Sequence, residues 1–152
     1  MFSKACEYGI RATIFIAWNT RNEKRVNLKQ IAAEIGSPEA FTAKILQQLV
    51  RSEIIYSTKG ATGGFSLNTE HAATLMLSTL VAAIDGDSIY RSCGLGLRSC
   101  SAKEPCPMHD QFMQVREQLR EMLEKTPISE LTEDYGDGLT FLKRDITETN
   151  TN

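Results

Sequence analysis

A mostly helical fold with one small β-hairpin is predicted for this chain of 152 residues by three patterns in its sequence. Apolar residues recur at helical spacing through the first fifty residues. The glycine-rich stretch K-G-A-T-G-G, residues 59–64, lies between two short segments of β-branched and aromatic residues. After residue 107, an apolar residue at every third or fourth position predicts one long helix suited to pairing.

Two helices are expected first. Residues 3–20 are predicted to form a helix with one broad apolar face. Residues 28–35 form the second, in which Asn27 is the N-cap and Gln30, three residues later, is its capping-box partner. Gly36 ends this helix, because glycine adopts the left-handed conformation of a helix stop without strain.

A third helix and a hairpin complete a winged helix-turn-helix pattern. Ser37 is the expected N-cap of the third helix, with Pro38 at its first position. Its predicted buried stripe comprises Phe41, Ile45, Leu49 and Val50. Strands are expected within residues 54–58 and 65–68, directly after the two helices joined by the glycine turn. This order predicts a winged helix, and a plain helical hairpin in a bundle is the alternative.

A long helix is expected towards the C-terminus, over residues 108–125, and Pro127 follows its end. Its apolar residues have heptad gaps of four and three: Met108, Phe112, Val115, Leu119 and Met122. A small winged helix has little core left to cover such a stripe, so we expect this helix to pair with its copy in a homodimer. An intramolecular core helix is the alternative.

The predicted organisation has four parts. A winged helix-turn-helix DNA-binding domain spans residues 1–86 and ends in a short buried helix over residues 74–86. A cysteine loop follows at residues 87–107, and then the dimerisation helix with a short further helix at residues 108–135. The polar tail, residues 136–152, is predicted to be disordered.

Charge and hydropathy limit the possible functions. Residues 1–70 carry nine Lys and Arg against six Asp and Glu, a net charge of +3, whereas residues 71–152 carry −5. The basic half suits a surface that meets DNA phosphates, although chance explains the imbalance equally well. The longest strongly apolar run, residues 12–18, is too short to cross a bilayer, and no signal peptide is recognised. We therefore expect a cytoplasmic protein with reduced thiols and no membrane partner.

Three of the four cysteines lie in one glycine- and proline-containing segment. Six residues separate Cys93 from Cys100, and five separate Cys100 from Cys106. Zinc knuckles pair ligands about two to four residues apart, so neither gap fits one. A longer loop suits an iron–sulfur cluster, whose separate iron atoms each need thiolate ligands. Zinc, a thiol switch and the absence of any site are the alternatives.

Several segments together are similar to a known family. They are S-K-A-C-E-Y-G-I-R-A at residues 3–12, K-G-A-T-G-G-F-S-L at 59–67, A-I-D-G at 83–86 and the three-cysteine loop. The chain resembles, over residues 1–135, the Rrf family of winged-helix regulators, of the iron–sulfur type represented by IscR and NsrR. The resemblance implies a homodimeric bacterial regulator with a [2Fe–2S] or [4Fe–4S] cluster on Cys93, Cys100 and Cys106. The first cysteine gap is one residue longer than the family pattern.

Three residues are candidates for the fourth ligand of the cluster. The resemblance offers Glu7, contributed by a second copy as in some nitric-oxide sensors, and His109, as in IscR-like members. Cys6 is the strongest thiolate donor, but neighbouring helical residues point about 100° apart, so Cys6 and Glu7 do not serve equally. We favour Glu7 slightly. The alternatives are a Cys6 that is simply buried and a His109 with no ligand role.

DNA contacts are expected from the third helix, the wing and the first helix. The second helix of a helix-turn-helix enters the major groove. Its residues expected away from the apolar stripe are Glu39, Thr42, Ala43, Lys44 and Gln47. The candidates on the wing and the first helix are Lys59, Gly63, Gly64, Lys4 and Tyr8. Lys44 suits guanine or phosphate and Gln47 suits adenine, while a solvated charge is the alternative for each lysine.

The resulting hypothesis is a transcription regulator, most simply a repressor, that binds a double-stranded DNA operator. Its affinity is set by a cluster that senses nitric oxide, redox state or cluster status, and the cluster is expected to be lost in air. A cluster-free regulator with a thiol–disulfide switch in the cysteine loop is the alternative. Catalysis is not expected, because no oxyanion loop or nucleotide-phosphate motif accompanies the two histidines.

Overall fold

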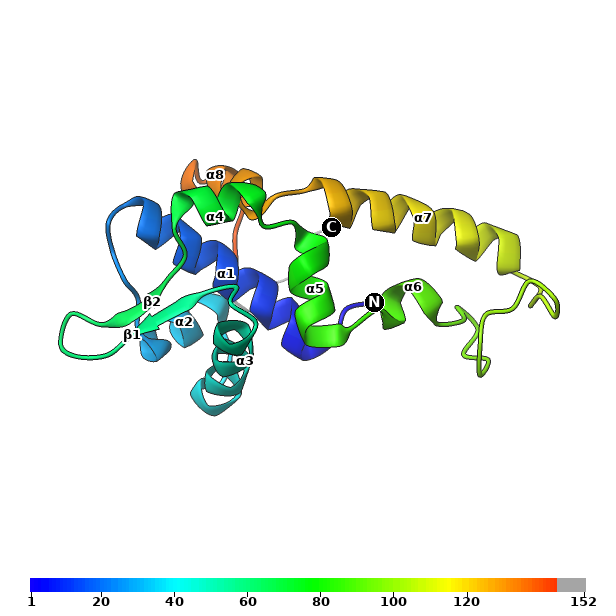
Figure 1. Ribbon diagram of the computed structural model, residues 1–152, viewed down its shortest axis with the longest axis horizontal. Coiled ribbons are helices and arrows are strands. Elements are labelled where there is room, and N and C mark those ends of the chain that lie inside the picture. Colours follow the sequence, from blue (N-terminus) through cyan, green and yellow to red (C-terminus); the bar gives the residue numbers. More distant parts are fainter. Residues whose placement is uncertain (145–152) are drawn as a thin grey trace.

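The computed structural model describes residues 1–144, which form a helical body with a hairpin at one end and a long projecting helix at the other (Figure 1). The elements are α1 Lys4–Arg21, α2 Leu28–Ile35, α3 Glu39–Arg51, β1 Tyr56–Thr58, β2 Gly64–Ser66, α4 Thr69–Thr74, α5 Leu77–Asp85, α6 Ser88–Arg91, α7 His109–Lys125 and α8 Ile128–Gly136. The strands pair antiparallel, with Tyr56 opposite Ser66. The predicted mostly helical fold with one hairpin is confirmed. Within this described part, no helix is long and apolar enough to span a bilayer.

Local capping explains where the first two helices begin and end. The Ser3 hydroxyl oxygen accepts a hydrogen bond from the Cys6 backbone N–H at the start of α1. At α2, the Asn27 side chain accepts from the Gln30 backbone, and the Gln30 side chain accepts from the Asn27 backbone, both at 2.9 Å. Gly36 stops α2 with a left-handed φ of 64°. The predicted capping box and helix stop are both present.

The third helix departs from its prediction in detail. α3 begins at Glu39, so Pro38 stands at the N-cap position that was expected for Ser37, and no side chain there makes a capping hydrogen bond. Its fully buried residues are Thr42, Ile45, Leu46 and Leu49. Phe41 and Val50, which were expected in the buried stripe, are only partly buried. The buried face is set by α1, α2 and α5, which all pack against α3.

The hairpin is shorter than predicted because its flanking apolar residues enter the core. Ile54, Ile55 and Leu67 lie just outside the strands and are buried. Gly64 has a φ of 136°, and a Cβ there would lie 2.8 Å from the Val26 carbonyl oxygen. Val26 also exchanges two backbone hydrogen bonds with β2. The segment before α2 thus ties the hairpin to the helices.

Two short helices were not predicted from the sequence. α4 follows the hairpin, where the Asn68 side chain accepts a hydrogen bond from the His71 backbone N–H at 2.7 Å. α6 is a single turn before the cysteine loop. So short a helix leaves no periodic apolar pattern to detect. The expected helix over residues 74–86 starts later, at Leu77, because Met76 forms a β-bridge with Pro127.

The start of α1 is tied to the end of α5. Asp85 accepts hydrogen bonds from the Ser3 backbone N–H at 2.9 Å and from the Ser3 hydroxyl. The segments S-K-A-C and A-I-D-G, far apart in the sequence, therefore meet in space. α1 packs against α2, α3, α5 and α8, so it is the helix around which the body is assembled.

The segment after α8 packs against the helix-turn-helix. Leu142 is buried, and Arg11 in α1 donates hydrogen bonds to the carbonyl oxygens of Leu142 and Ile35, both at 2.9 Å. The predicted disorder is therefore wrong for residues 137–144, because this segment has a buried anchor that its polar composition conceals. The remainder of the predicted tail, residues 145–152, lies outside the described residues.

Replacing Leu142 with alanine is expected to lower the free energy of unfolding by about 2–4 kcal/mol, since it removes a buried side chain and leaves a cavity. Leu139→Ala is the matched control, because Leu139 is 71% exposed and Leu142 only 7%. The control is expected to change stability by less than about 0.5 kcal/mol. Urea unfolding at one protein concentration measures both, and equal effects would contradict the packing of this segment.

Candidate functional site

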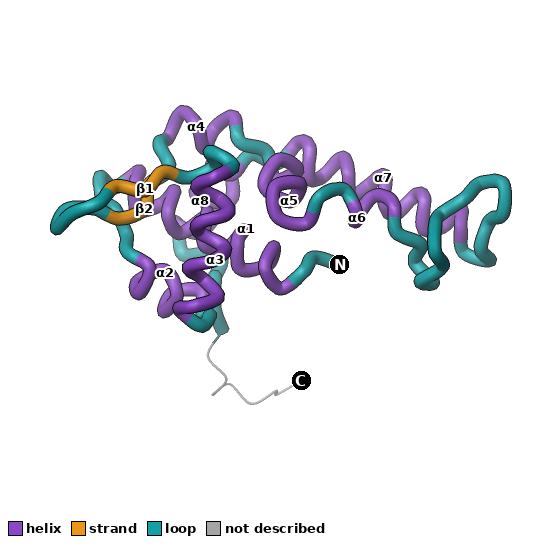
Figure 2. The backbone as a smooth tube through the Cα atoms, turned by 60° about the horizontal axis from the view of Figure 1, so that its bottom comes forward, coloured by secondary structure: helices purple, strands orange, loops and turns teal. Residues whose placement is uncertain are grey.

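The cysteine loop lies at the free end of α7, away from the helical body (Figures 1 and 2). α7 begins where the His109 backbone N–H donates to the Cys106 carbonyl oxygen at 3.0 Å. Phe112 holds the loop from α7, because its ring would lie only 2.2 Å from a Cβ placed on Gly94. Glycine at position 94 therefore permits the close contact that seats the loop on the helix.

Cys93 lies at the start of the loop and is buried. Hydrogen bonds from the backbone N–H groups of Leu95 and Leu97 lower the pKa of Cys93, and the Cys106 thiol and the Arg116 charge lower it further. Burial acts in the opposite direction. Hydrogen bonds to sulfur are one means by which proteins tune iron–sulfur clusters, so this environment suits a thiolate ligand.

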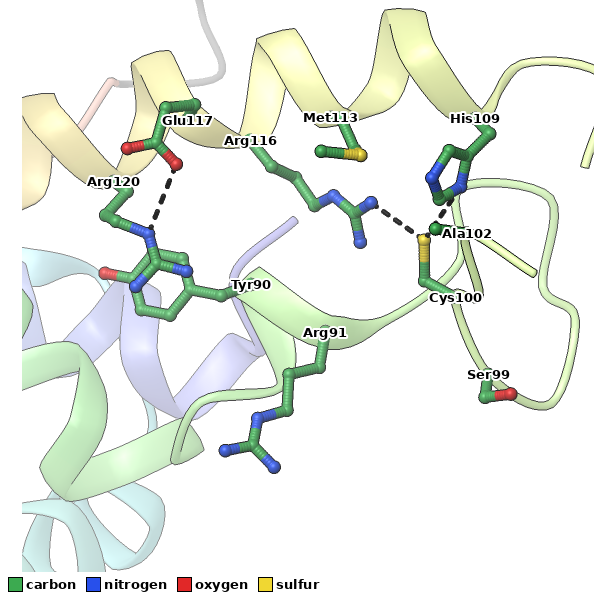
Figure 3. A pocket seen from close by; sticks show the side chains of 10 residues that line it. All are labelled: Tyr90, Arg91, Ser99, Cys100, Ala102, His109, Met113, Arg116, Glu117 and Arg120. Carbon is green, nitrogen blue, oxygen red and sulfur yellow. Dashed lines mark hydrogen bonds and ion pairs between the residues drawn. The ribbon is translucent and has the colours of Figure 1, made fainter. Parts of the chain in front are cut away.

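Cys100 faces a surface cavity of about 510 Å³ between α6, the loop and α7 (Figure 3). Its sulfur accepts a hydrogen bond from Arg116 Nη2 at 2.9 Å and lies 3.4 Å from His109 Nδ1. His109 is only 8% exposed, and its Nε2 has no hydrogen-bond partner among residues 1–144. A buried nitrogen without a partner calls for an explanation, and a metal ligand role would supply one.

The two other ligand candidates lie in the helical body, on α1. Burial, and then the charge of Asp85, raises the pKa of Cys6 to about 12, and its side chain is fully buried. Glu7 forms an ion pair with Lys4 at 2.8 Å, and that hydrogen bond lowers the pKa of Glu7. α1 lies apart from the loop at the tip of α7 (Figure 1). Within one chain, the structure therefore brings His109 to the loop, but neither Glu7 nor Cys6.

The loop thiols divide into two groups. Cys93 lies beside Cys106, whereas Cys100 lies beside His109. No three His, Cys, Asp or Glu side chains in residues 1–144 are arranged to hold one metal ion. Three thiols and one imidazole on the same loop and helix start are donors that bind iron, so the chemistry of these side chains fits an iron–sulfur cluster.

The exposed face of α3 carries most of the residues expected to read DNA. Its exposed or partly exposed members are Glu39, Ala43, Lys44 and Gln47. Thr42 is only 1% exposed, and its hydroxyl donates to the Pro38 carbonyl oxygen at 2.8 Å, so its predicted place on this face is wrong. Positions 42, 45, 46 and 49 have the i, i+3, i+4, i+7 spacing of one buried helix face, which is the signal that identifies Thr42 as internal.

The wing offers one exposed cation. Lys59 lies at the start of the hairpin loop and is exposed. A Cβ on Gly63 would lie 2.1 Å from the Thr58 carbonyl oxygen, and Gly64 is held against the segment before α2. The two glycines therefore shape the hairpin itself, and their contact with DNA stays a prediction.

The α1 candidates are partly engaged within the chain. Lys4 is exposed but pairs with Glu7. Tyr8 packs edge-on against Phe41 of α3, with ring centroids 5.7 Å apart, and the Arg11 guanidinium lies 4.7 Å from its ring. Tyr8 thus positions α3 whether or not it contacts phosphate.

The apolar residues of the α7 stripe fall into two groups, one that packs within the chain and one that stays exposed. Phe112 contacts the cysteine loop, Leu119 packs against the core, and Leu123 is fully buried. The residues of the stripe that stay exposed are spaced by seven: Met108, Val115 and Met122. An apolar row at this spacing is typical of helix pairing.

Iodoacetamide at about pH 8 is expected to modify Cys100 and Cys106 in the folded, metal-free protein and to leave Cys6 intact. Cys6 is buried, and its pKa of about 12 keeps it protonated, whereas the thiolate is the reactive form. Mass spectrometry of tryptic peptides after a short exposure measures this, and the same treatment in urea should modify all four cysteines. Modification of Cys6 at the rate of the loop thiols would contradict its buried position.

Comparison with known proteins agrees with this architecture. The family model Rrf2, described as an iron-dependent transcriptional regulator, matches residues 2–134. A protein of Aquifex aeolicus (strain VF5) that bears the name of an HTH-type transcriptional regulator is 29% identical over 134 residues. The alignment covers 86% of this chain and 90% of that protein.

Two solved structures share the fold. CymR (YrzC), the global cysteine regulator of B. subtilis, has a TM-score of 0.69 at 18% identity, covering 88% of this chain and 96% of that one. T. potens IscR has a TM-score of 0.70 at 17% identity, covering 92% and 91%. Because the family model spans the winged helix, the cysteine loop and α7, the chain belongs to the Rrf2 family of transcriptional regulators.

Proposed function

We propose that this protein is a homodimeric, cytoplasmic repressor whose affinity for a double-stranded DNA operator is set by an iron–sulfur cluster on the cysteine loop. The cluster is [2Fe–2S] or [4Fe–4S] and responds to nitric oxide, redox state or cluster supply. The observation that carries the proposal is the placement of three thiols on one loop at the tip of α7, with hydrogen-bond donors directed at two of the sulfurs. No catalytic step is part of this function.

Cys93, Cys100 and Cys106 would hold the cluster. His109 is the fourth ligand that the fold favours within one chain, because its ring lies beside the Cys100 sulfur and keeps a buried nitrogen unpaired. Glu7 would serve only from a second copy, and it would first have to leave Lys4. When bound, the cluster would supply a centre that reacts with oxidants and nitric oxide.

Dimerisation would couple the loop to the DNA-reading helices. The exposed row of Met108, Val115 and Met122 fits a second copy of α7 lying along it. Half-sites about one turn of DNA apart, roughly 34 Å, require a fixed separation of the two α3 helices. A loop that changes shape at the start of α7 would change this separation, and about 1.4 kcal/mol of differential affinity already gives tenfold regulation.

A cluster-free thiol switch is the second candidate function. It is favoured by the neighbouring Cys93 and Cys106 thiols, which interact with each other. One structural relative, CymR (YrzC), is the global cysteine regulator of B. subtilis. In this alternative, a two-electron oxidant such as hydrogen peroxide would take two electrons and two protons from the two thiols, which leaves a disulfide and two molecules of water, and no iron would be needed.

Protein purified without oxygen, or reconstituted with iron and sulfide, is expected to absorb visible light and to contain iron and acid-labile sulfide. Replacing Cys93, Cys100 and Cys106 together by alanine should abolish all three signals, because the thiolate ligands are gone. Cys6→Ala is the matched control and should retain them, since Cys6 lies in the core. A colourless wild-type protein that forms a reversible Cys93–Cys106 disulfide would favour the thiol switch instead.

Lys44→Ala is expected to weaken binding to a duplex selected from a random-sequence pool, and Gln47→Ala to weaken discrimination at one base pair by about 1–3 kcal/mol. If Lys44 meets a phosphate, the slope of log K against log salt should fall by about one. Lys125→Ala is the control, because Lys125 pairs with Glu121 within α7, outside the helix-turn-helix and the wing. Fluorescence anisotropy across a salt series measures all three, and equal slopes for the Lys44 and Lys125 variants would contradict a phosphate contact by Lys44.

A further inference from the structure

Arg116 connects α7 to two points of the cysteine loop. Its Nη1 donates to the Ser92 carbonyl oxygen at 3.0 Å, and its Nη2 donates to the Cys100 sulfur at 2.9 Å. Ser92 directly precedes Cys93, so one guanidinium holds the loop both at its start and at its second thiol (Figure 3). A planar fork with fixed donors orients its acceptors more strictly than a single ammonium does.

The other two arginines of the same cavity are engaged elsewhere. Arg91 pairs with Asp87 at 2.7 Å. Arg120 lies 4.4 Å from the Tyr90 ring and pairs with carboxylates of its own helix. Among the ion pairs of residues 1–144, none involves Arg116. Its charge is therefore directed at sulfur without a carboxylate to neutralise it.

We infer that Arg116 is a positioning residue that locks the cysteine loop onto α7 and tunes the cofactor held by that loop. The inference rests on the proposed function for the cofactor, whereas the locking of the loop stands on the hydrogen bonds alone. Arg116 is not a ligand, because a guanidinium has no lone pair to give to iron. It acts through Ser92 and Cys100.

Three measurable effects follow from this geometry. Hydrogen bonds to ligand sulfurs and nearby charge set the reduction potential of iron–sulfur clusters, and a cation favours the reduced, more negative state. Partners that orient a ligand from outside the first shell typically contribute about 10–100-fold to metal affinity. Loss of Arg116 should therefore lower the reduction potential, weaken iron retention and free the loop from α7.

Three variants separate these effects. Arg116→Met removes the charge and both hydrogen bonds but keeps a long apolar stem. Arg116→Lys keeps the charge without the planar fork. Arg120→Met is the control, because Arg120 lies about one helical turn along the same cavity and stacks on Tyr90 without touching sulfur.

In the metal-free protein, hydrogen exchange of the loop peptides is measured first. We expect exchange at least about tenfold faster in Arg116→Met and Arg116→Lys, and wild-type rates in Arg120→Met, because a released loop opens more often. Exchange in the α1 and α5 peptides should stay unchanged, which shows that the variants fold. Wild-type exchange in the loop of Arg116→Met, or equal acceleration in Arg120→Met, would overturn the locking role.

In the anaerobically reconstituted protein, the reduction potential and the transfer of iron to a chelator are measured next. Arg116→Met should have a lower potential than the wild type and about 10–100-fold weaker iron retention, while Arg116→Lys should recover most of the potential. An unchanged potential and unchanged iron retention in Arg116→Met would overturn the tuning role. If the wild-type protein itself takes up no iron and sulfide, the proposed function fails and the tuning role with it, and the exchange data still decide whether Arg116 locks the loop.

Discussion

α7 is fixed to the helical body at its C-terminal end and carries the cysteine loop at the other. Leu123 is fully buried in the core, whereas Val115, about two turns earlier, is 58% exposed. α5 packs against α7, and the single turn of α6 lies beside it. The loop is therefore joined to the helical body by two routes, along α7 and along the chain that leaves α5 through α6.

Most of the fold could be predicted because it depends on local chemistry. Asn27, Gln30 and Gly36 act within one or two turns of backbone, and such interactions are visible in the order of residues. Packing between distant elements is not visible in this way. Leu46 is buried because α1 and α5 cover α3, and Leu142 is buried because the chain returns to α2 after α8.

The candidate site shows the same difference between local features, which the sequence reveals, and contacts between distant segments, which it does not. Cysteine spacing singles out the loop, and His109 follows it closely enough to be suspected from the sequence. Arg116 stands sixteen residues from Cys100, and only the return of α7 alongside the loop brings them together. Arg98 stands much closer to Cys100 along the chain than Arg116 does, yet it is Arg116 that donates to the Cys100 sulfur. A cation that reaches a sulfur only through tertiary packing cannot be identified from its position in the sequence.

The family match ends at residue 134, ten residues before the described chain does. Beyond that boundary, Tyr135 donates a hydrogen bond to Glu34 at 2.8 Å, and the Leu142 carbonyl shares Arg11 with that of Ile35. These hydrogen bonds attach the C-terminal segment to the end of α2, next to the turn that leads into α3. A protein trimmed to the family boundary would have its helix-turn-helix without these hydrogen bonds, so domain limits drawn from relatives alone would misjudge how firmly α2 and α3 are held.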